Sequence, residues 1–101
     1  MPELQQKTFT IRDKTYVMKE MIGEEDLAFQ QQFTNPQTFA VNIRDLWFKR
    51  LSRTIITPQM SETDLRQLSA YELSALITQW RLINEPDPSS FLSNSEDTKT
   101  T

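Results

Sequence analysis

The alternation of apolar and polar residues near the N-terminus predicts a β-hairpin over residues 7–21. Apolar side chains at every second position alternate with threonines, which is the pattern of two strands that each have one covered face. Arg12-Asp13-Lys14 separates the two runs and predicts the turn, because aspartate favours turn conformations. Since a lone hairpin is marginal in water, we expect its apolar face to pack on helices or on another strand. The apolar positions are Phe9, Ile11, Tyr16 and Met18.

Farther along, apolar residues recur at helical spacing, and the longest such run covers residues 39–56. Its apolar side chains nearly encircle the axis, so we expect this helix to be central in the domain or to face a partner. Asn35 and Pro36 suit a helix cap and a first helical position, which places the start after Pro36. The β-branched run before Pro58 marks the end.

Three shorter helices are predicted around this one. The first begins after Gly23, where acidic residues suit a first turn, and ends near residue 34. The others cover Glu62–Leu68 and Ala70–Asn84, or form one helix bent near Ser69, because Ser69 and Glu72 make a capping box ahead of an apolar run. On the last helix, one face holds Leu73, Leu76, Ile77, Trp80 and Ile83, and a second stripe holds Tyr71, Ala75 and Leu82.

The periodic pattern stops at residue 85, where prolines, serines and acidic residues predict a polar tail. The sequence therefore predicts an α+β protein with a short N-terminal β-hairpin packed on a small bundle of three to four helices. The expected organisation is a flexible N-terminus over 1–6, a single α+β domain over 7–84 and a mobile C-terminal tail over 85–101. Within the tail, Phe91 begins the only apolar pair, which either packs onto the core or anchors a partner.

Composition excludes most enzyme chemistries. The 101 residues include one glycine, no cysteine and no histidine. Phosphate-cradling loops need several glycines, and catalytic triads, thiolate nucleophiles and most metal sites need histidine or cysteine. The acidic clusters at Glu24–Asp26 and at Glu62 and Asp64 lie where helix starts attract acids, and they lack the spacing of a calcium loop. We therefore expect a protein that is not an enzyme, with no catalytic residue, metal or cofactor.

Net charge and hydropathy limit the classes of partner that we expect this protein to bind. A net charge of −3 argues against nucleic acid, and the sequence has neither an apolar run long enough to span a bilayer nor a start typical of a signal peptide. The expected protein is therefore cytoplasmic and binds neither nucleic acid nor membrane. Arg44, Lys49, Arg50 and Arg53 surround two aromatic residues and imitate a nucleic-acid-binding stripe. Because Lys49 and Arg53 fall on the polar face, a solvated helix face with ion pairs is the favoured interpretation.

Several residues are candidates for binding a protein partner. A helical wheel of residues 39–56 places Arg44 in the middle of the apolar face. There it either pairs with a glutamate, reaches out of the core, or contacts an acidic partner surface. Both long helices also carry a second apolar stripe, which is either sandwiched in the bundle or forms an interface, and the small core favours the interface. The partner-binding candidates are Phe39, Leu46, Arg44, Tyr71, Leu82 and Phe91.

The order of elements resembles the tail assembly chaperones of long-tailed bacteriophages and prophages. The resemblance covers about residues 7–94 and is carried by the hairpin KTFTIRDKTYVMKEM, the closing helix LSAYELSALITQWRLINEP and the polar tail. It implies a non-catalytic protein in the host cytoplasm that binds the tape measure protein and keeps it soluble while tail tube subunits are recruited. Self-association is a further expectation. The alternative is a small non-enzymatic adaptor or regulatory protein that binds one folded partner.

Overall fold

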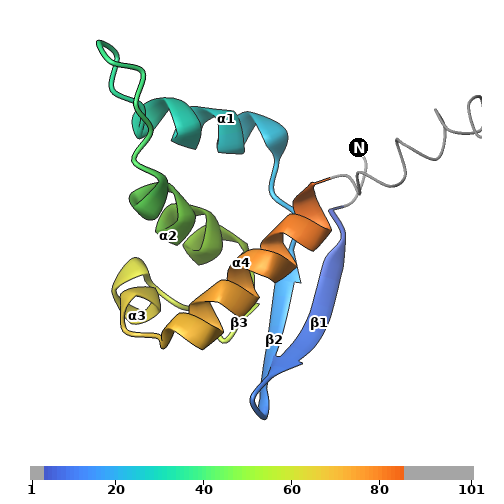
Figure 1. Cartoon of the computed structure of the whole chain (residues 1–101). Coiled ribbons are helices and arrows are strands. Elements are labelled where there is room, and N and C mark those ends of the chain that lie inside the picture. The colour runs from blue at the N-terminus through green and yellow to red at the C-terminus, as the bar shows by residue number, and fades with distance from the viewer. Residues whose placement is uncertain (1–3, 86–101) are drawn as a thin grey trace, which may run out of the picture.

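A three-stranded antiparallel sheet and four helices make up residues 4–85, the part of the chain that the computed structural model describes (Figure 1). The predicted α+β class and the N-terminal hairpin are confirmed. The predicted tail, with Phe91, lies outside the described residues except for Glu85. The elements are β1 (Gln6–Ile11), β2 (Lys14–Lys19), α1 (Gly23–Gln32), α2 (Ile43–Thr54), β3 (Ile55–Thr57), α3 (Glu62–Arg66) and α4 (Ala70–Asn84).

The hairpin forms as its alternation predicts. Ile11, Tyr16 and Met18 are buried, and Phe9 faces Tyr16 across the strands with its ring stacked at 5.7 Å. Ile11 pairs with Lys14, which leaves a two-residue loop of Arg12 and Asp13. Both loop residues have positive φ, 48° and 67°, as in the hairpin turns whose twist matches that of the flanking strands.

The third strand was not predicted. Ile55–Thr57 leaves the end of α2 and pairs antiparallel with β2 at Val17 and Met18, giving the sheet order β1-β2-β3. The sequence analysis assigned this β-branched run to the end of the helix. Such residues fit a pleated sheet better than a helix, and the free edge of β2 supplies the partner for their backbone.

The predicted start of the central helix was wrong. Helix α2 begins at Ile43, and the side chain of Asn42 caps it by accepting the backbone N–H of Asp45 at 3.2 Å. Asn35 instead stabilises a turn, because its side-chain oxygen accepts the backbone N–H groups of Gln37 and Thr38. A positive φ of 62° at Phe39 further separates this segment from a helix.

The core lies between the sheet and helices α2 and α4. Trp47 of α2 and Trp80 of α4 meet edge to face with ring centroids 5.1 Å apart, a favoured aromatic geometry. Helix α4 has its predicted bounds, and Ser69 caps it by accepting the backbone N–H of Glu72 at 3.1 Å. Its predicted core face is confirmed, since Leu76 and Trp80 are buried and Leu73, Ile77 and Ile83 pack against the core.

The connection between α1 and α2 projects from the rest of the fold, beyond the ends of both helices (Figure 1). Helix α1 itself is loosely seated, since none of its residues is buried within the described part of the chain. This end of the molecule therefore differs from the well-packed end formed by the sheet and α4.

Candidate protein-binding surface

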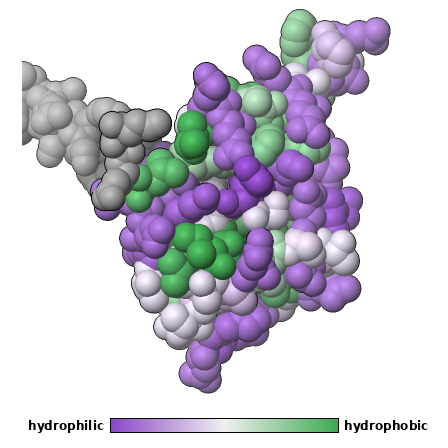
Figure 2. All heavy atoms as spheres, turned by 180° about the vertical axis from the view of Figure 1, so that it is seen from behind, coloured by the Kyte–Doolittle hydropathy of each residue, from purple (hydrophilic) through white to green (hydrophobic). Residues whose placement is uncertain are grey.

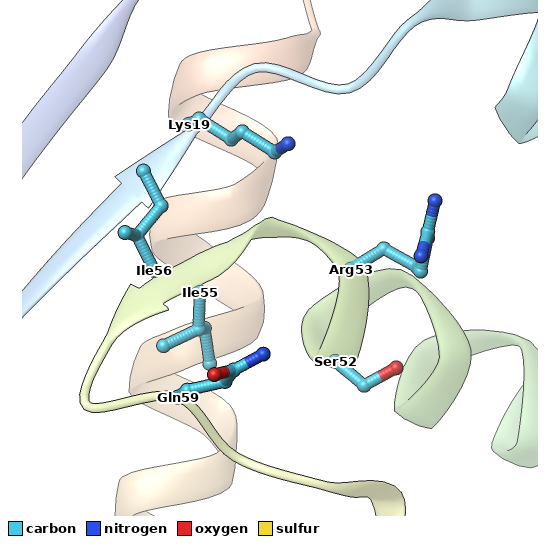
Figure 3. A pocket seen from close by; sticks show the side chains of 6 residues that line it. All are labelled: Lys19, Ser52, Arg53, Ile55, Ile56 and Gln59. Atoms are coloured by element: carbon cyan, nitrogen blue, oxygen red, sulfur yellow. The ribbon is translucent and has the colours of Figure 1, made fainter.

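A hollow lies between the end of β2, the last turn of α2 and β3 (Figure 3). It has a volume of about 310 Å³ and is lined by Lys19, Ser52, Arg53, Ile55, Ile56 and Gln59. Arg53 donates to Glu25 at 2.6 Å, and the Ser52 hydroxyl donates to the backbone oxygen of Lys49 at 2.9 Å. The Ser52 hydroxyl is thus engaged by the backbone, and no carboxylate lines the hollow.

Among residues 4–85, no group of three or more acidic, cysteine or histidine side chains is arranged to hold a metal ion. No helix in the same region is long and apolar enough to cross a membrane.

The basic cluster of α2 is largely neutralised by acids on other helices. Lys49 lies 3.6 Å from Glu62, Arg50 lies 2.7 Å from Asp26, and Arg53 lies 2.6 Å from Glu25. Lys49 and Arg53 are thus ion-paired on a partly exposed helix face, as predicted, whereas Arg50 is buried.

The cation embedded in the core is Arg50, which the sequence analysis missed. Its guanidinium lies 4.7 Å from the ring of Trp47 and 4.5 Å from that of Trp80, and it donates two hydrogen bonds to Asp26, at 2.7 and 3.1 Å. Planar stacking combined with bidentate pairing is a geometry that suits arginine rather than lysine. The sequence signal for this contact was the spacing of Trp47 and Arg50, because residues three apart are neighbours on a helix.

Arg44 is exposed and takes part in none of the four ion pairs found within residues 4–85. The wheel placed it at the centre of the buried face because it included residues 39–42, which are not helical. With the helix starting at Ile43, the buried face is centred near Trp47. Among the described residues Arg44 thus has no ion pair with a glutamate, which was one of the three alternatives for it.

The prediction that Leu46 binds a partner is wrong, because the side chain is buried. Leu46 is only 2% exposed, so it cannot belong to a surface that a partner contacts directly. The same shift of the helix start explains the error, because the buried face now includes Leu46. Phe39, Tyr71 and Leu82 are 77%, 59% and 62% exposed, as a contact surface requires.

Four exposed apolar side chains lie on α1, the projecting loop and the start of α2, and we call them the loop patch: Leu27, Phe39, Val41 and Ile43. Of these, Leu27 and Phe39 line one groove. In Figure 2, which shows the molecule from behind, the projecting loop at upper right carries hydrophobic atoms at its end. A separate hydrophobic area lies over the sheet, with hydrophilic side chains between the two (Figure 2). In this view the hydrophobic end of the projecting loop is separate from the area over the sheet.

The backbone around Phe39 is fixed by several hydrogen bonds. The N–H of Phe39 donates to the oxygen of Asn35 at 2.7 Å, and the N–H of Asn35 donates to the oxygen of Ala40 at 2.8 Å. At the base of the loop, Thr34 and Val41 form a β-bridge. A left-handed backbone is unusual for phenylalanine, so these bonds hold a large apolar side chain outward in a conformation that a free chain disfavours.

A shallow groove lies beside Phe39. It has a volume of about 410 Å³ and is lined by Leu27, Gln30, Gln31, Thr34, Pro36 and Phe39. The groove thus joins the outer side of α1 to the projecting loop. This combination of a fixed aromatic side chain and an adjoining groove is typical of an anchor point for another protein.

Tyr71 and Leu82 lie on a second surface, the α4 stripe, which we define as Tyr71, Ala75, Thr78 and Leu82. These residues follow one another at spacings of four, three and four, so they line one side of the helix. The Arg12 guanidinium of the hairpin turn lies 4.1 Å from the ring of Tyr71. Tyr71 and Leu82 therefore share one surface, and Phe39 lies on another. Arg44 is exposed in the first turn of α2.

Comparison with protein families, with curated proteins and with solved structures finds no match to this chain.

Proposed function

We propose that this protein is a tail assembly chaperone, which binds the tape measure protein of a long-tailed bacteriophage or prophage in the host cytoplasm and keeps it soluble. The proposal combines the resemblance of residues 7–94 to that family with the surface described above. The observation that carries it is the loop patch, where Phe39 is 77% exposed on a loop held by hydrogen bonds. A client with long apolar helices needs such a surface to cover it before the tail tube does.

The test is co-expression with fragments of a tape measure protein from a long-tailed bacteriophage. We expect the wild-type protein to keep a fragment soluble and to co-purify with it, and to help recruit tail tube subunits when these are added. A Phe39→Ser variant should lose most of the soluble fragment while remaining folded, because Phe39 contributes little to the core. A wild-type protein that leaves every tape measure fragment insoluble would contradict the proposal.

The α4 stripe favours a second candidate, an adaptor that binds one folded partner. Tyr71 and Leu82 are exposed at the two ends of a narrow row that one helix of a folded protein could cover. The same co-expression experiment separates the candidates, since an adaptor would not solubilise a tape measure fragment. Loss of partner binding in Leu82→Ser but not in Phe39→Ser would support the adaptor.

A further inference from the structure

The projecting loop and the end of α1 that adjoins it carry no charge. Residues 27–43 contain no aspartate, glutamate, lysine or arginine, although 25% of the chain is charged. The groove beside Phe39 belongs to this segment, because all of its lining residues fall within it. The acidic residues of α1 lie in its first turn, at the other end of the helix from the loop. The groove and the loop are therefore uncharged in a protein whose net charge is −3.

A surface of this composition suits a second copy of itself. In a two-fold dimer, the same patch of both copies forms the interface, so its side chains must be compatible with one another. Charged side chains repel their own copies, whereas a carboxamide both donates and accepts hydrogen bonds and can pair with another carboxamide. Gln31, Gln32 and Gln37 are exposed carboxamides of this segment. Two copies of this acidic chain therefore meet here without placing like charges in contact.

Phe39 and the groove are a projection and a hollow that lie side by side. The Phe39 side chain is 77% exposed, and the adjoining groove, at about 410 Å³, has room for one aromatic side chain. Phe39 forms one wall of the groove of its own chain, so it leaves that groove open. A two-fold rotation about an axis between the two features brings the Phe39 ring of each copy to the groove of the other. One surface thus supplies both halves of a reciprocal contact.

The backbone at Phe39 also indicates a contact outside the monomer. Its φ of 62° lies in the left-handed region, which glycine and asparagine adopt more readily than phenylalanine. Local folding thus favours a different residue at this position, and the exposed ring gains little burial within the monomer in return. Burial of the ring in an assembly accounts for a large apolar side chain on such a backbone.

We infer that the projecting loop joins two copies of this chain, with Phe39 of each copy inserted into the groove of the other. Carboxamides such as those of Gln31 and Gln37 surround the two rings and form hydrogen bonds between the copies. Residues 27–43 are fewer than the about 20–30 residues per side of a standard interface, so the dimer is weak. The inference goes beyond the proposed function, because it concerns contacts of the chain with itself. It rests on that function in one consequence only, that the second copy covers the client surface until a client displaces it.

The first test is sedimentation equilibrium of the full chain from about 10 µM to about 1 mM, the range in which a small interface associates. We expect a reversible equilibrium between monomer and dimer. On dilution of the ¹⁵N-labelled chain, amide shifts should concentrate in residues 27–43. Phe39→Asn should weaken the association by about tenfold or more, as for an anchoring aromatic residue. Its midpoint of urea unfolding should not fall, because asparagine suits the left-handed backbone.

Three further variants define the contact. Leu82→Ala removes a side chain that is 62% exposed from the α4 stripe and should leave the association unchanged. Gln31→Glu and Gln31→Lys each place like charges on both sides of the two-fold axis, and each should weaken the association by about two- to fivefold. An equimolar mixture of the two Gln31 variants brings unlike charges together and should restore it. Gln31 is exposed, and a dispersed amide spectrum checks that each variant is folded.

Four outcomes would overturn the inference: a chain that stays monomeric at about 1 mM, dilution shifts that map to α4 or the sheet, an unchanged association in Phe39→Asn, or no rescue in the mixture of Gln31 variants. The proposed function can fail separately. If the chain dimerises as expected but every tape measure fragment stays insoluble, the dimer stands and the chaperone proposal falls. If the chain is monomeric throughout and still keeps a fragment soluble, the chaperone proposal stands and the dimer falls.

Discussion

Replacing Asp26 by alanine should destabilise the domain far more than replacing its neighbour Glu25. Asp26 receives two hydrogen bonds from Arg50, and the two side chains are 17% and 10% exposed. Removing the carboxylate leaves the Arg50 guanidinium between two tryptophan rings without a counter-charge. Breaking a buried pair in this way costs about 3–5 kcal/mol. Because Asp26 keeps some exposure to water, we expect a loss at or below the lower end of that range, about 2–3 kcal/mol.

Glu25 provides the matched control on the same helix. Its partner Arg53 is 54% exposed and Glu25 itself is 30% exposed, so water screens this pair. Exposed pairs contribute about 0.2–1 kcal/mol, and we expect Glu25→Ala to cost no more than that. Both alanine substitutions remove one carboxylate from the first turn of α1, so the loss of favourable helix-dipole interaction is similar in the two variants.

The assay is urea unfolding followed by far-UV circular dichroism, because both tryptophans lie beside Arg50 and their fluorescence would respond to the substitution itself. A domain of this size has a free energy of unfolding of about 4–12 kcal/mol, so a loss of 2–3 kcal/mol moves the midpoint clearly. Adding Arg50→Met to Asp26→Ala should restore part of the loss, since it removes the uncompensated charge. Equal losses in Asp26→Ala and Glu25→Ala would refute the reasoning.

Three further predictions follow from the first half of α2. Leu46→Ala should lower the free energy of unfolding by about 2–5 kcal/mol because Leu46 is 2% exposed. Phe39→Ala should change it by less than about 1 kcal/mol because Phe39 is 77% exposed. Comparable losses for the two variants in urea titrations would contradict the difference in burial. Asn42→Ala removes the cap of α2 and should cost about 1 kcal/mol in the same titrations, and no loss would mean that the cap is not formed in solution. The Arg66 guanidinium donates to Asp45 at 2.9 Å and holds the pKa of Asp45 below its usual 3.8. A carboxylate with a lowered pKa stabilises the fold above its unfolded pKa. The stability advantage of wild type over Asp45→Asn should therefore be complete above pH 3.8 and disappear as the pH falls through the lowered pKa. An advantage that grows on acidification would contradict this.

The elements that could be predicted are those defined by local signals. The hairpin follows from alternation over two short runs, and the start of α4 follows from Ser69 and Glu72 three residues later. In both cases the residues that determine the element also lie within it. The fold class could be read from the sequence because these elements contribute much of the core, namely Ile11, Tyr16, Met18, Leu76 and Trp80.

The elements that could not be predicted depend on contacts between distant residues. Asn35 followed by Pro36 fits a helix start and a turn equally well, and the left-handed backbone of Phe39 has no signal in a residue that disfavours it. Strand β3 exists because β2 has a free edge, which a local pattern does not show. The same limit applies to the surface. Because the predicted start of α2 was several residues too early, Leu46 was predicted to be exposed and Arg44 to lie on the buried face.

The loose seating of α1 has a consequence for how the domain fluctuates. Within the described chain α1 has no fully buried residue, and two of its contacts with α2 are ion pairs. It should therefore open locally at a lower free energy than α4. Its backbone amides should therefore exchange with solvent faster than those of α4. Higher salt should increase this difference, because screening weakens the more exposed of the two pairs. If α1 detaches while the rest of the domain stays folded, Leu27 changes position. The groove beside Phe39 can then widen to take side chains of different sizes.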